Sequence, residues 1–493
     1  MTIYEAIETF VQIAIKNAVI KAADQIYYRN QLAHFVGVRD WQALQAVIRD
    51  SLVARDVLLA TAQANNQIAD GDDEFFEAAL MNFITPLPSQ LNETFWAKYQ
   101  EAPSMATQYF FNLAKEVDQV KTQAIAKNIA FDYSSKYGNL EITINLSKPE
   151  KDPKAIAAAK LIKNSGYPAC ALCVENEGLY GGGSQPARSN HRIVRLELNG
   201  EAYGLQYSPY AYYPEHSIVM NVKHKPMEIS EQTFVKLLNF VDQFPHYMIG
   251  SNADLPIVGG SILSHDHFQA GRHDFPMAKV GLRKQVVLTG FPEIEAGILA
   301  WPMSVLRLKS TNQAQLVAAS AKILNAWRKY DDQALSITGR DAEGIDHHTI
   351  TPIVRHQDKS YEVDLVLRDN NVSAQYPDGI FHPHAPLHHI KKENIGLIEV
   401  MGLAVLPARL KTELAEVEAY LLDQPANVAP SHQAWADELK QEADFTEANV
   451  HTKVQAAVGA VFERVLEDAG VYKDNPTGLA GFERFITFVN QKG

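Results

Sequence analysis

Two histidines and a glutamine near the middle of the chain have residue types and a spacing that suit group-transfer chemistry. The stretch reads His265-Asp-His267-Phe-Gln269. The residues before it are apolar and partly β-branched, so we expect the histidines on or just after a strand, where residues two apart share a face. Two imidazoles and a carboxamide on one face favour phosphoryl or nucleotidyl transfer through a histidine.

A turn of small residues precedes the histidines. Gly259, Gly260 and Ser261 stand a few positions upstream. The free backbone N–H groups of such a turn can hold a phosphate. A His-x-His pair alone is more often structural or incidental. The following glutamine and the upstream turn are what favour a functional site here.

Long blocks of the sequence carry a family resemblance. The block from Ser251 to Gly271 resembles the active-site signature of class II galactose-1-phosphate uridylyltransferases, the bacterial branch of that enzyme, within the histidine triad superfamily. Blocks that begin at Leu140, Cys170, Ser208 and His388 resemble the same branch, in the same order. The resemblance therefore covers most of the chain and is weakest near the C-terminus.

This resemblance implies an activity and a set of site residues. The protein would exchange UMP between UDP-glucose and galactose 1-phosphate in galactose metabolism, by a ping-pong mechanism. His267 would attack the α-phosphorus and carry the uridylyl group, and Gln269 would donate to a phosphoryl oxygen. The candidate substrate-binding residues are Asn252, Gly259, Gly260, Ser261, Arg188 and Asn190.

The two cysteines of the chain stand at Cys-x-x-Cys spacing, as Cys170 and Cys173. Two cysteines are too few for a disulfide framework, and their spacing fits metal or redox chemistry. Histidines downstream favour metal, because a redox pair does not need them. The resemblance implies a zinc site of Cys170, Cys173, His224 and His265, with His216 as the competitor for the third place.

A second His-x-His pair, His382 and His384, follows a repeat of the strand, helix and strand order. Ala-Pro follows His384 where the first copy has its glutamine, so the second copy looks catalytically degenerate. In related enzymes the matching pair contributes to a second metal site, which implies iron or zinc here. We interpret the repeat as an internal duplication.

The expected fold class is α+β. An α-rich N-terminal region would precede two histidine-triad-like half-domains, each an antiparallel sheet with helices, in a pseudo-twofold arrangement, and a helical C-terminal tail would follow. The expected regions are 1–138 for the N-terminal part, 139–280 for the first half with the active site, 281–410 for the second half, and 411–493 for the tail.

Composition limits the remaining function classes. The chain has 493 residues, 46% of them hydrophobic and 21% charged, as expected for a globular protein with a large core. A formal net charge of −13 and the lack of a basic run argue against nucleic-acid binding. The N-terminus does not resemble a signal peptide, and no stretch is apolar enough to span a membrane. We expect a cytoplasmic homodimer whose partners are UDP-sugars and hexose 1-phosphates.

Two other functions remain open from the sequence. One is another histidine triad enzyme, a nucleotide phosphorylase or hydrolase that uses His267 with phosphate or water as acceptor. The other is a zinc-stabilised scaffold in which both His-x-His pairs are metal ligands. Gln269 and the glycine turn favour the transferase over the scaffold, because a metal-binding pair needs neither.

Overall fold

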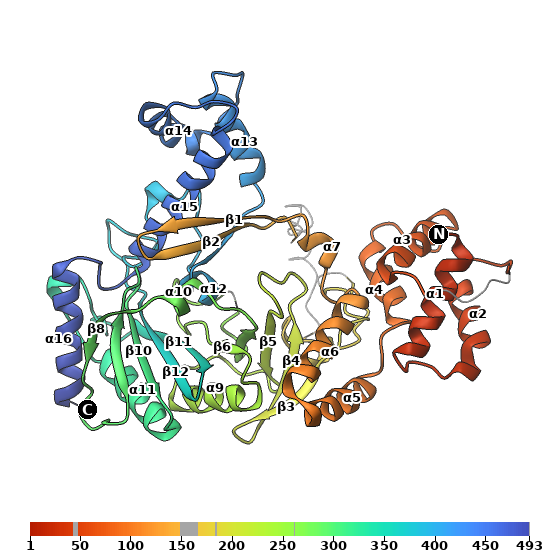
Figure 1. Ribbon diagram of the computed structural model, residues 1–493, viewed down its shortest axis with the longest axis horizontal. Helices are drawn as coiled ribbons and strands as arrows, with labels where there is room; N and C mark the ends of the chain where they lie inside the picture. The colour runs from red at the N-terminus through yellow and green to blue at the C-terminus, as the bar shows by residue number, and fades with distance from the viewer. Residues whose placement is uncertain (43–47, 148–165, 183–184, 261, 493) are drawn as a thin grey trace. The chain divides into compact units, whose positions relative to one another are not determined.

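The computed structural model describes residues 1–42, 48–147, 166–182, 185–260 and 262–492 (Figure 1). Ser261 and the helix predicted near Ala155 lie outside these ranges. The chain divides into two compact units. Unit 1 comprises 1–123, 149–211 and 215–225, and unit 2 comprises 124–148, 212–214 and 226–493.

Unit 1 begins with helices, as the sequence pattern predicts. In the first helix, Ile7, Phe10 and Ala14 repeat at helical spacing and are fully buried. Its N-terminus is closed by a capping box, in which Glu5 N–H donates to Thr2 Oγ1 at 3.2 Å and Thr2 N–H donates to the Glu5 carboxylate at 2.6 Å. The helices are α1 (Ile3–Lys16), η1 (Ala22–Asp24), α2 (Gln25–Phe35), α3 (Ser51–Ala64), α4 (Asp73–Asn82), α5 (Pro88–Glu101) and α6 (Pro103–Glu116), and α7 (Thr122–Ile125) spans the unit boundary.

Unit 1 also holds the antiparallel strands β3 (Val194–Leu198), β4 (Glu201–Tyr207) and β5 (Ser217–Asn221), and the short helix η2 (Val174–Asn176). Asn92 on α5 joins this helix to β3, because its Nδ2 donates to Ile193 O at 3.1 Å. The sequence pattern predicts strand from residue 208 onward. That prediction is wrong for 208–216, which form a connection rich in proline and tyrosine between β4 and β5.

Unit 2 contains an antiparallel sheet in the order β7-β6-β11-β12-β10-β9-β8. The sequence pattern of residues 350–370 predicts a hairpin, and the structure confirms it: Gln357 pairs with Ser360 at its tip and His348 with Asp369 at its base. In Figure 1, β10, β11 and β12 run side by side. The strands are β6 (Met248–Gly250), β7 (His267–Gly271), β8 (Leu282–Val286), β9 (Glu295–Leu299), β10 (Val305–Ser310), β11 (His348–Gln357) and β12 (Ser360–Asp369).

Helices pack on this sheet. The predicted helices α9 (Glu231–Gln243) and α11 (Gln313–Trp327) are confirmed; α9 contacts β6 and β11, and α11 contacts α9 and the central strands. The N–H of Ser230 donates to Thr233 Oγ1 at 3.0 Å and closes the first turn of α9. The C-terminal helix α16 (Pro476–Lys492) packs on α11.

A second, smaller sheet in unit 2 joins β1 (Ile129–Ser135), β2 (Gly138–Ile144) and β13 (Leu403–Leu406). It shares one hydrophobic core with residues of the larger sheet and of the C-terminal helices. Gly459 lets α15 approach β1, since a Cβ there would lie 2.2 Å from Tyr133. The remaining elements are α10 (Pro276–Lys279), η3 (Gln333–Leu335), η4 (Ala385–Leu387), α12 (Leu397–Val400), α13 (Leu410–Leu421), α14 (Pro430–Glu442) and α15 (Val450–Ala469).

The expected α+β class is therefore confirmed: helices come first, mainly antiparallel sheets follow, and helices end the chain. The four-region division and the pseudo-twofold relation of the halves remain predictions. In the part of the chain that the structure describes, no helix combines the length and apolar character that crossing a membrane requires.

Candidate active site

Strand β7 begins at His267, and His265 precedes it. The sequence suggests that the apolar residues before the histidines form a strand, and this is wrong. Residues 254–258 form bends and a turn, with Ile257 at φ +70°, and neither Ile262 nor Leu263 lies in a strand. The apolar residues that anchor the strand come after its first histidine instead, as Phe268 and Ala270, both buried.

One hydrogen bond fixes the tautomer of His267. Its Nδ1 lies 2.8 Å from the His265 carbonyl oxygen, which can only accept, so Nδ1 carries the proton. The opposite ring nitrogen, Nε2, then has the free lone pair. Burial lowers the pKa of His267 below its usual 6.5, although the bond to His265 acts in the other direction. The ring is therefore neutral near pH 7, and its Nε2 can act as a nucleophile.

Gln269 follows His267 at the next position on the same face of β7. It is half-buried and pairs with Gly250 on β6. Because side chains two apart on a strand point the same way, its carboxamide lies on the side of the His267 ring. The sequence pattern predicts this relation between the two side chains, and the strand assignment accounts for it.

Close packing around the turn requires glycine at positions 259 and 260. A Cβ on Gly259 would lie 2.5 Å from both the Ala253 and the Leu255 carbonyl oxygens. A Cβ on Gly260 would lie 2.8 Å from Asn252 Nδ2. The turn therefore folds tightly over the preceding loop, and no side chain fits at Gly259 without moving backbone.

Asn252 supports this turn. Its Oδ1 accepts the Leu397 N–H at 2.9 Å, at the start of α12, and its Nδ2 faces Gly260. The side chain thus joins two segments 145 residues apart. Its predicted contact with substrate remains a prediction, since one half of the amide already has a protein partner.

Asp254 is a residue of the site that sequence reasoning missed. Its carboxylate accepts the Ile229 N–H at 2.8 Å and the Thr349 hydroxyl at 2.5 Å. It therefore holds the loop before the glycine turn against α9 and β11. A short acidic side chain within an apolar loop was the available signal, since such a residue needs partners when it is buried.

A buried charged network supports the segment that contacts Asn252. Lys391 and Glu399, both buried, form an ion pair at 2.5 Å, and Glu399 also accepts the Gly396 N–H at 2.9 Å. Arg368, 2% exposed, donates to the Ile395 carbonyl at 2.9 Å. Sequence reasoning assigned no role to these residues, because their partners are distant along the chain.

Two predicted substrate-binding residues, Arg188 and Asn190, lie in unit 1. Asn190 is buried, and its Nδ2 donates to the Val117 carbonyl at 2.7 Å. That bond indicates a structural task within unit 1. Burial lowers the pKa of the Arg188 guanidinium, and Tyr210 and Glu74 partly offset this effect. The roles of both residues toward substrate remain predictions.

The two cysteines and His224 lie together in unit 1. The sulfurs of Cys170 and Cys173 are 3.6 Å apart, and Cys173 Sγ is 3.3 Å from His224 Nδ1. Backbone N–H groups of Cys170 and Leu172 donate to the sulfurs at 3.3 and 3.4 Å, as they would to thiolates. Two sulfurs and an imidazole nitrogen within 4.8 Å of one another fit the donor set of a metal ion such as zinc.

The other residues predicted as metal ligands, or as competitors for a ligand position, are His216, His265, His382 and His384. His216 is buried, but among the described residues His224 and not His216 belongs to the cysteine group. His265 is fully buried in unit 2. His384 stacks on Tyr376 with ring centroids 4.0 Å apart, and its nitrogens contact Ile380 O at 3.0 Å and Asp468 at 3.3 Å. His382 is buried nearby in sequence, and the second metal site remains a prediction.

A neutral buried imidazole at the start of a strand, followed by a glutamine and preceded by a glycine turn, fits the class of α+β enzymes that transfer a group through histidine. Family models agree with this class. Residues 18–226 match the galactose-1-phosphate uridyl transferase N-terminal domain, and residues 239–437 match its C-terminal domain. The chain belongs to the galactose-1-phosphate uridyl transferase family.

Full-length relatives support this membership. A galactose-1-phosphate uridylyltransferase of Lactococcus lactis subsp. cremoris (strain SK11) is 62% identical over 493 residues, covering all of both chains. That of Enterococcus faecalis (strain ATCC 700802 / V583) is 54% identical over 484 residues, 97% of each chain. A crystal structure of yeast Ap4A phosphorylase Apa2 covers 72% of this chain and 94% of its own, but its 13% identity and TM-score of 0.34 are too low to add to the assignment.

Proposed function

We propose that this protein transfers a uridylyl group from UDP-glucose to galactose 1-phosphate, in galactose metabolism, through a covalent adduct on His267. The observation that carries the proposal is the hydrogen bond from His267 Nδ1 to the His265 carbonyl, which leaves Nε2 as a free, neutral nucleophile. The full-length similarity to galactose-1-phosphate uridylyltransferases supports the substrates.

In the first half-reaction, Nε2 of His267 attacks the α-phosphorus of UDP-glucose. The bond from this phosphorus to the bridging oxygen breaks, and glucose 1-phosphate leaves with the bonding electrons. The ring becomes a cationic uridylyl-imidazole, and the bond from Nδ1–H to the His265 carbonyl stabilises the positive charge. Gln269 donates to a non-bridging phosphoryl oxygen, where charge shifts during transfer.

In the second half-reaction, a phosphate oxygen of galactose 1-phosphate attacks the same phosphorus. The phosphorus–nitrogen bond breaks, UDP-galactose forms, and His267 returns to its neutral state. The N–H groups of the turn at Gly259, Gly260 and Ser261 are proposed to hold the adjacent phosphate. Asn252, Arg188 and Asn190 stay candidates for the uridine and sugar-phosphate ends.

We further propose a structural zinc ion held by Cys170, Cys173, His224 and His265. The contacts of the first three, and the family resemblance for all four, support it. When bound, the ion supplies folding energy and not reaction chemistry. His265 would then be fixed, and with it the carbonyl that orients His267. A second site at His382 and His384, for iron or zinc, is proposed on resemblance alone, as are a homodimer and a cytoplasmic location.

Initial-rate kinetics test the proposed function. With a covalent intermediate, glucose 1-phosphate leaves before galactose 1-phosphate reacts, so double-reciprocal plots should give parallel lines. Labelled glucose 1-phosphate should also exchange into UDP-glucose when galactose 1-phosphate is absent. Intersecting lines without exchange would contradict the covalent route. Net production of UMP in the exchange mixture would indicate a hydrolase instead.

A further inference from the structure

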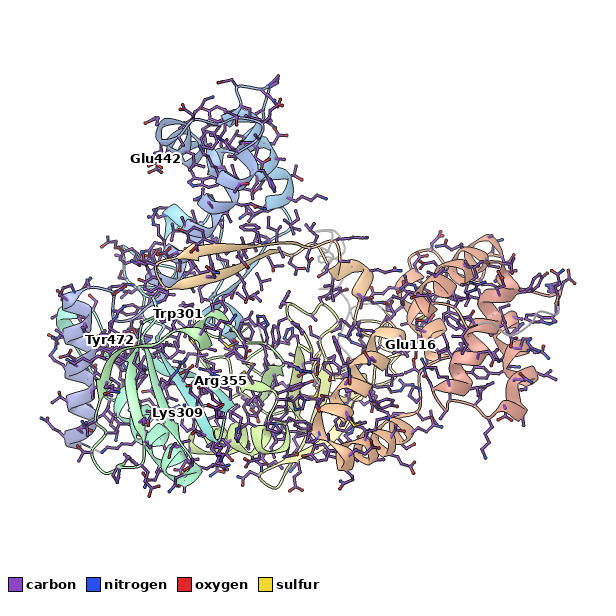
Figure 2. The ribbon with its side chains drawn as sticks, in the orientation of Figure 1. Glu116, Trp301, Lys309, Arg355, Glu442 and Tyr472 are labelled. Carbon is purple, nitrogen blue, oxygen red and sulfur yellow. The ribbon has the colours of Figure 1, made fainter. Side chains whose placement is uncertain are left out.

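A cleft of about 460 Å³ opens in unit 2, near the ends of strands β7 and β11 and the start of β6. Figure 2 labels one of its residues, Arg355, which stands on β11. The cleft falls within the size range of small-ligand sites. It is lined by Pro245, His246, Tyr247, Met248, Arg272, His273, Asp274, Lys279, Arg355 and His356.

The charges in this cleft are mainly positive. Arg272 and Lys279 are exposed, and among the described residues that line the cleft Asp274 is the one acid. This balance contrasts with the chain as a whole, whose formal net charge is −13. A concave surface with one sign of charge concentrates ions of the opposite sign. The cleft is therefore suited to an anion.

Arg355 forms the wall of the cleft and is already paired. Its guanidinium donates to Glu362 and, at 2.7 Å, to Asp364. Arg307 binds the same Asp364 at 2.7 Å, so two arginines share two buried acids. This network fixes Arg355 in place but leaves it little charge to offer. Arg272 and Lys279 must supply the attraction.

Two histidines of the cleft, His246 and His273, contribute to its walls. Burial, and then the charge of Arg272, lower the pKa of His246 to about 4, so its ring is neutral at pH 7. His273 Nε2 lies 2.8 Å from Glu141 and its ring contacts Tyr213 and Phe275. A cleft with one arginine fork and one ammonium group at its surface has the charged donors that a phosphate group requires.

The cleft is separate from the proposed nucleophile. His267 begins β7, and Arg272 follows its last residue, Gly271. At about 3.3 Å per residue, the four steps from His267 to Gly271 span roughly 13 Å. A phosphate in the cleft would thus lie too far from His267 Nε2 to react there.

We propose that this cleft binds the phosphate group of a small metabolite, at a site distinct from the catalytic centre. The proposal does not depend on the transferase function, because it rests on the charges and walls of the cleft alone. Inorganic phosphate and a phosphorylated sugar share this chemistry, and the experiment separates them.

Phosphorus NMR titrations of the full chain test the proposal. Inorganic phosphate and, separately, glucose 6-phosphate are titrated into the His267→Ala variant, first alone and then with saturating UDP-glucose, which occupies the catalytic centre of this variant without reacting. Saturable binding of either probe supports a phosphate site in the cleft. A lower Kd for glucose 6-phosphate identifies a sugar phosphate as the ligand, and equal Kd values identify phosphate alone. No saturable binding would overturn the proposal.

Variants locate the binding. Arg272→Gln and Lys279→Gln should each raise Kd about tenfold, the usual effect of losing one charged hydrogen bond. Lys329→Gln, at an exposed lysine outside the cleft, is the matched control and should leave Kd unchanged. Thermal unfolding of each variant checks that it folds. Equal losses in all three variants, or displacement of the probe by UDP-glucose, would overturn a separate site.

Discussion

At the scale of single residues, His267 has two properties that the proposed reaction requires. The His265 carbonyl fixes its proton on Nδ1, and burial keeps the ring neutral. Neither property is encoded in the His-x-His spacing itself. The tautomer comes from the backbone at the start of β7, where the His265 carbonyl faces the ring of His267, and the neutral state comes from the burial of that ring.

Gln269→Glu should slow transfer while the protein still folds. The carboxylate cannot donate to a phosphoryl oxygen, and its charge opposes the anionic substrate. We expect turnover to fall by about two to three orders of magnitude, the usual effect of losing one transition-state donor. Steady-state rates measure this. Gln424→Glu, at an exposed position just after α13, is the control. An equal loss of turnover in both variants would contradict the role of Gln269.

The rate of the first half-reaction should fall at acid pH, with a midpoint below pH 6.5. The pKa of His267 is lowered by burial, so the ring loses its free lone pair only when pH falls through that lowered value. The rate of glucose 1-phosphate release from UDP-glucose, followed by rapid quench between pH 5 and 8, measures this midpoint. The free energy of unfolding should also fall as pH falls below about 6.5, because the unfolded state takes up the proton before the folded state does. A midpoint above 6.5 would contradict the assigned tautomer and burial.

At the scale of elements, the loop before β7 is held by contacts from distant parts of unit 2. Asp254 joins it to α9 and β11, and Asn252 joins it to α12. Gly259 completes the turn, because the carbonyls of Ala253 and Leu255 occupy the space of a side chain.

Gly259→Ala should therefore destabilise the protein. The added Cβ would lie 2.5 Å from two backbone oxygens, and the loop must move to admit it. Overpacking of this kind costs about 1–3 kcal/mol. Denaturant unfolding measures the loss, and Gly281→Ala is the matched control, since a Cβ there meets nothing within 4 Å. Equal stability of the two variants would show that the turn can relax.

The elements that periodicity predicts are the regular ones. The hairpin of β11 and β12 and the helices α9 and α11 follow from alternation and helical spacing over ten or more residues. The apolar residues of Leu255 to Val258 suggest a strand, whereas residues 256–258 form a turn that begins at Pro256. The contact of Asn252 with Leu397 was not predictable, since local patterns carry no information about a partner 145 residues away.

At the scale of the whole molecule, the family resemblance supplied what local patterns could not. The spacing of Cys170 and Cys173 left metal and redox chemistry open, and the structure places His224 beside them. The Lys391–Glu399 pair and Arg368 escaped prediction, because buried charges are recognised only once their partners are known.

Removing one cysteine tests the zinc proposal. Cys170→Ser should lower the metal content by one equivalent per chain, measured by mass spectrometry of the purified protein. The midpoint of thermal unfolding should fall too, because a structural zinc ion contributes folding energy. His224→Gln should have the same effect on metal, and His216→Gln should not. Unchanged metal content in Cys170→Ser would exclude the cysteine site.

The covalent uridylyl-histidine is the central claim, and intact-mass measurement tests it most directly. The protein is incubated with UDP-glucose alone and quenched, and its intact mass is measured beside that of His267→Ala treated in the same way. We expect one added uridylyl group per wild-type chain, together with released glucose 1-phosphate, and no adduct on the folded His267→Ala variant. An adduct that persists in His267→Ala, or wild-type turnover without any adduct, would contradict it.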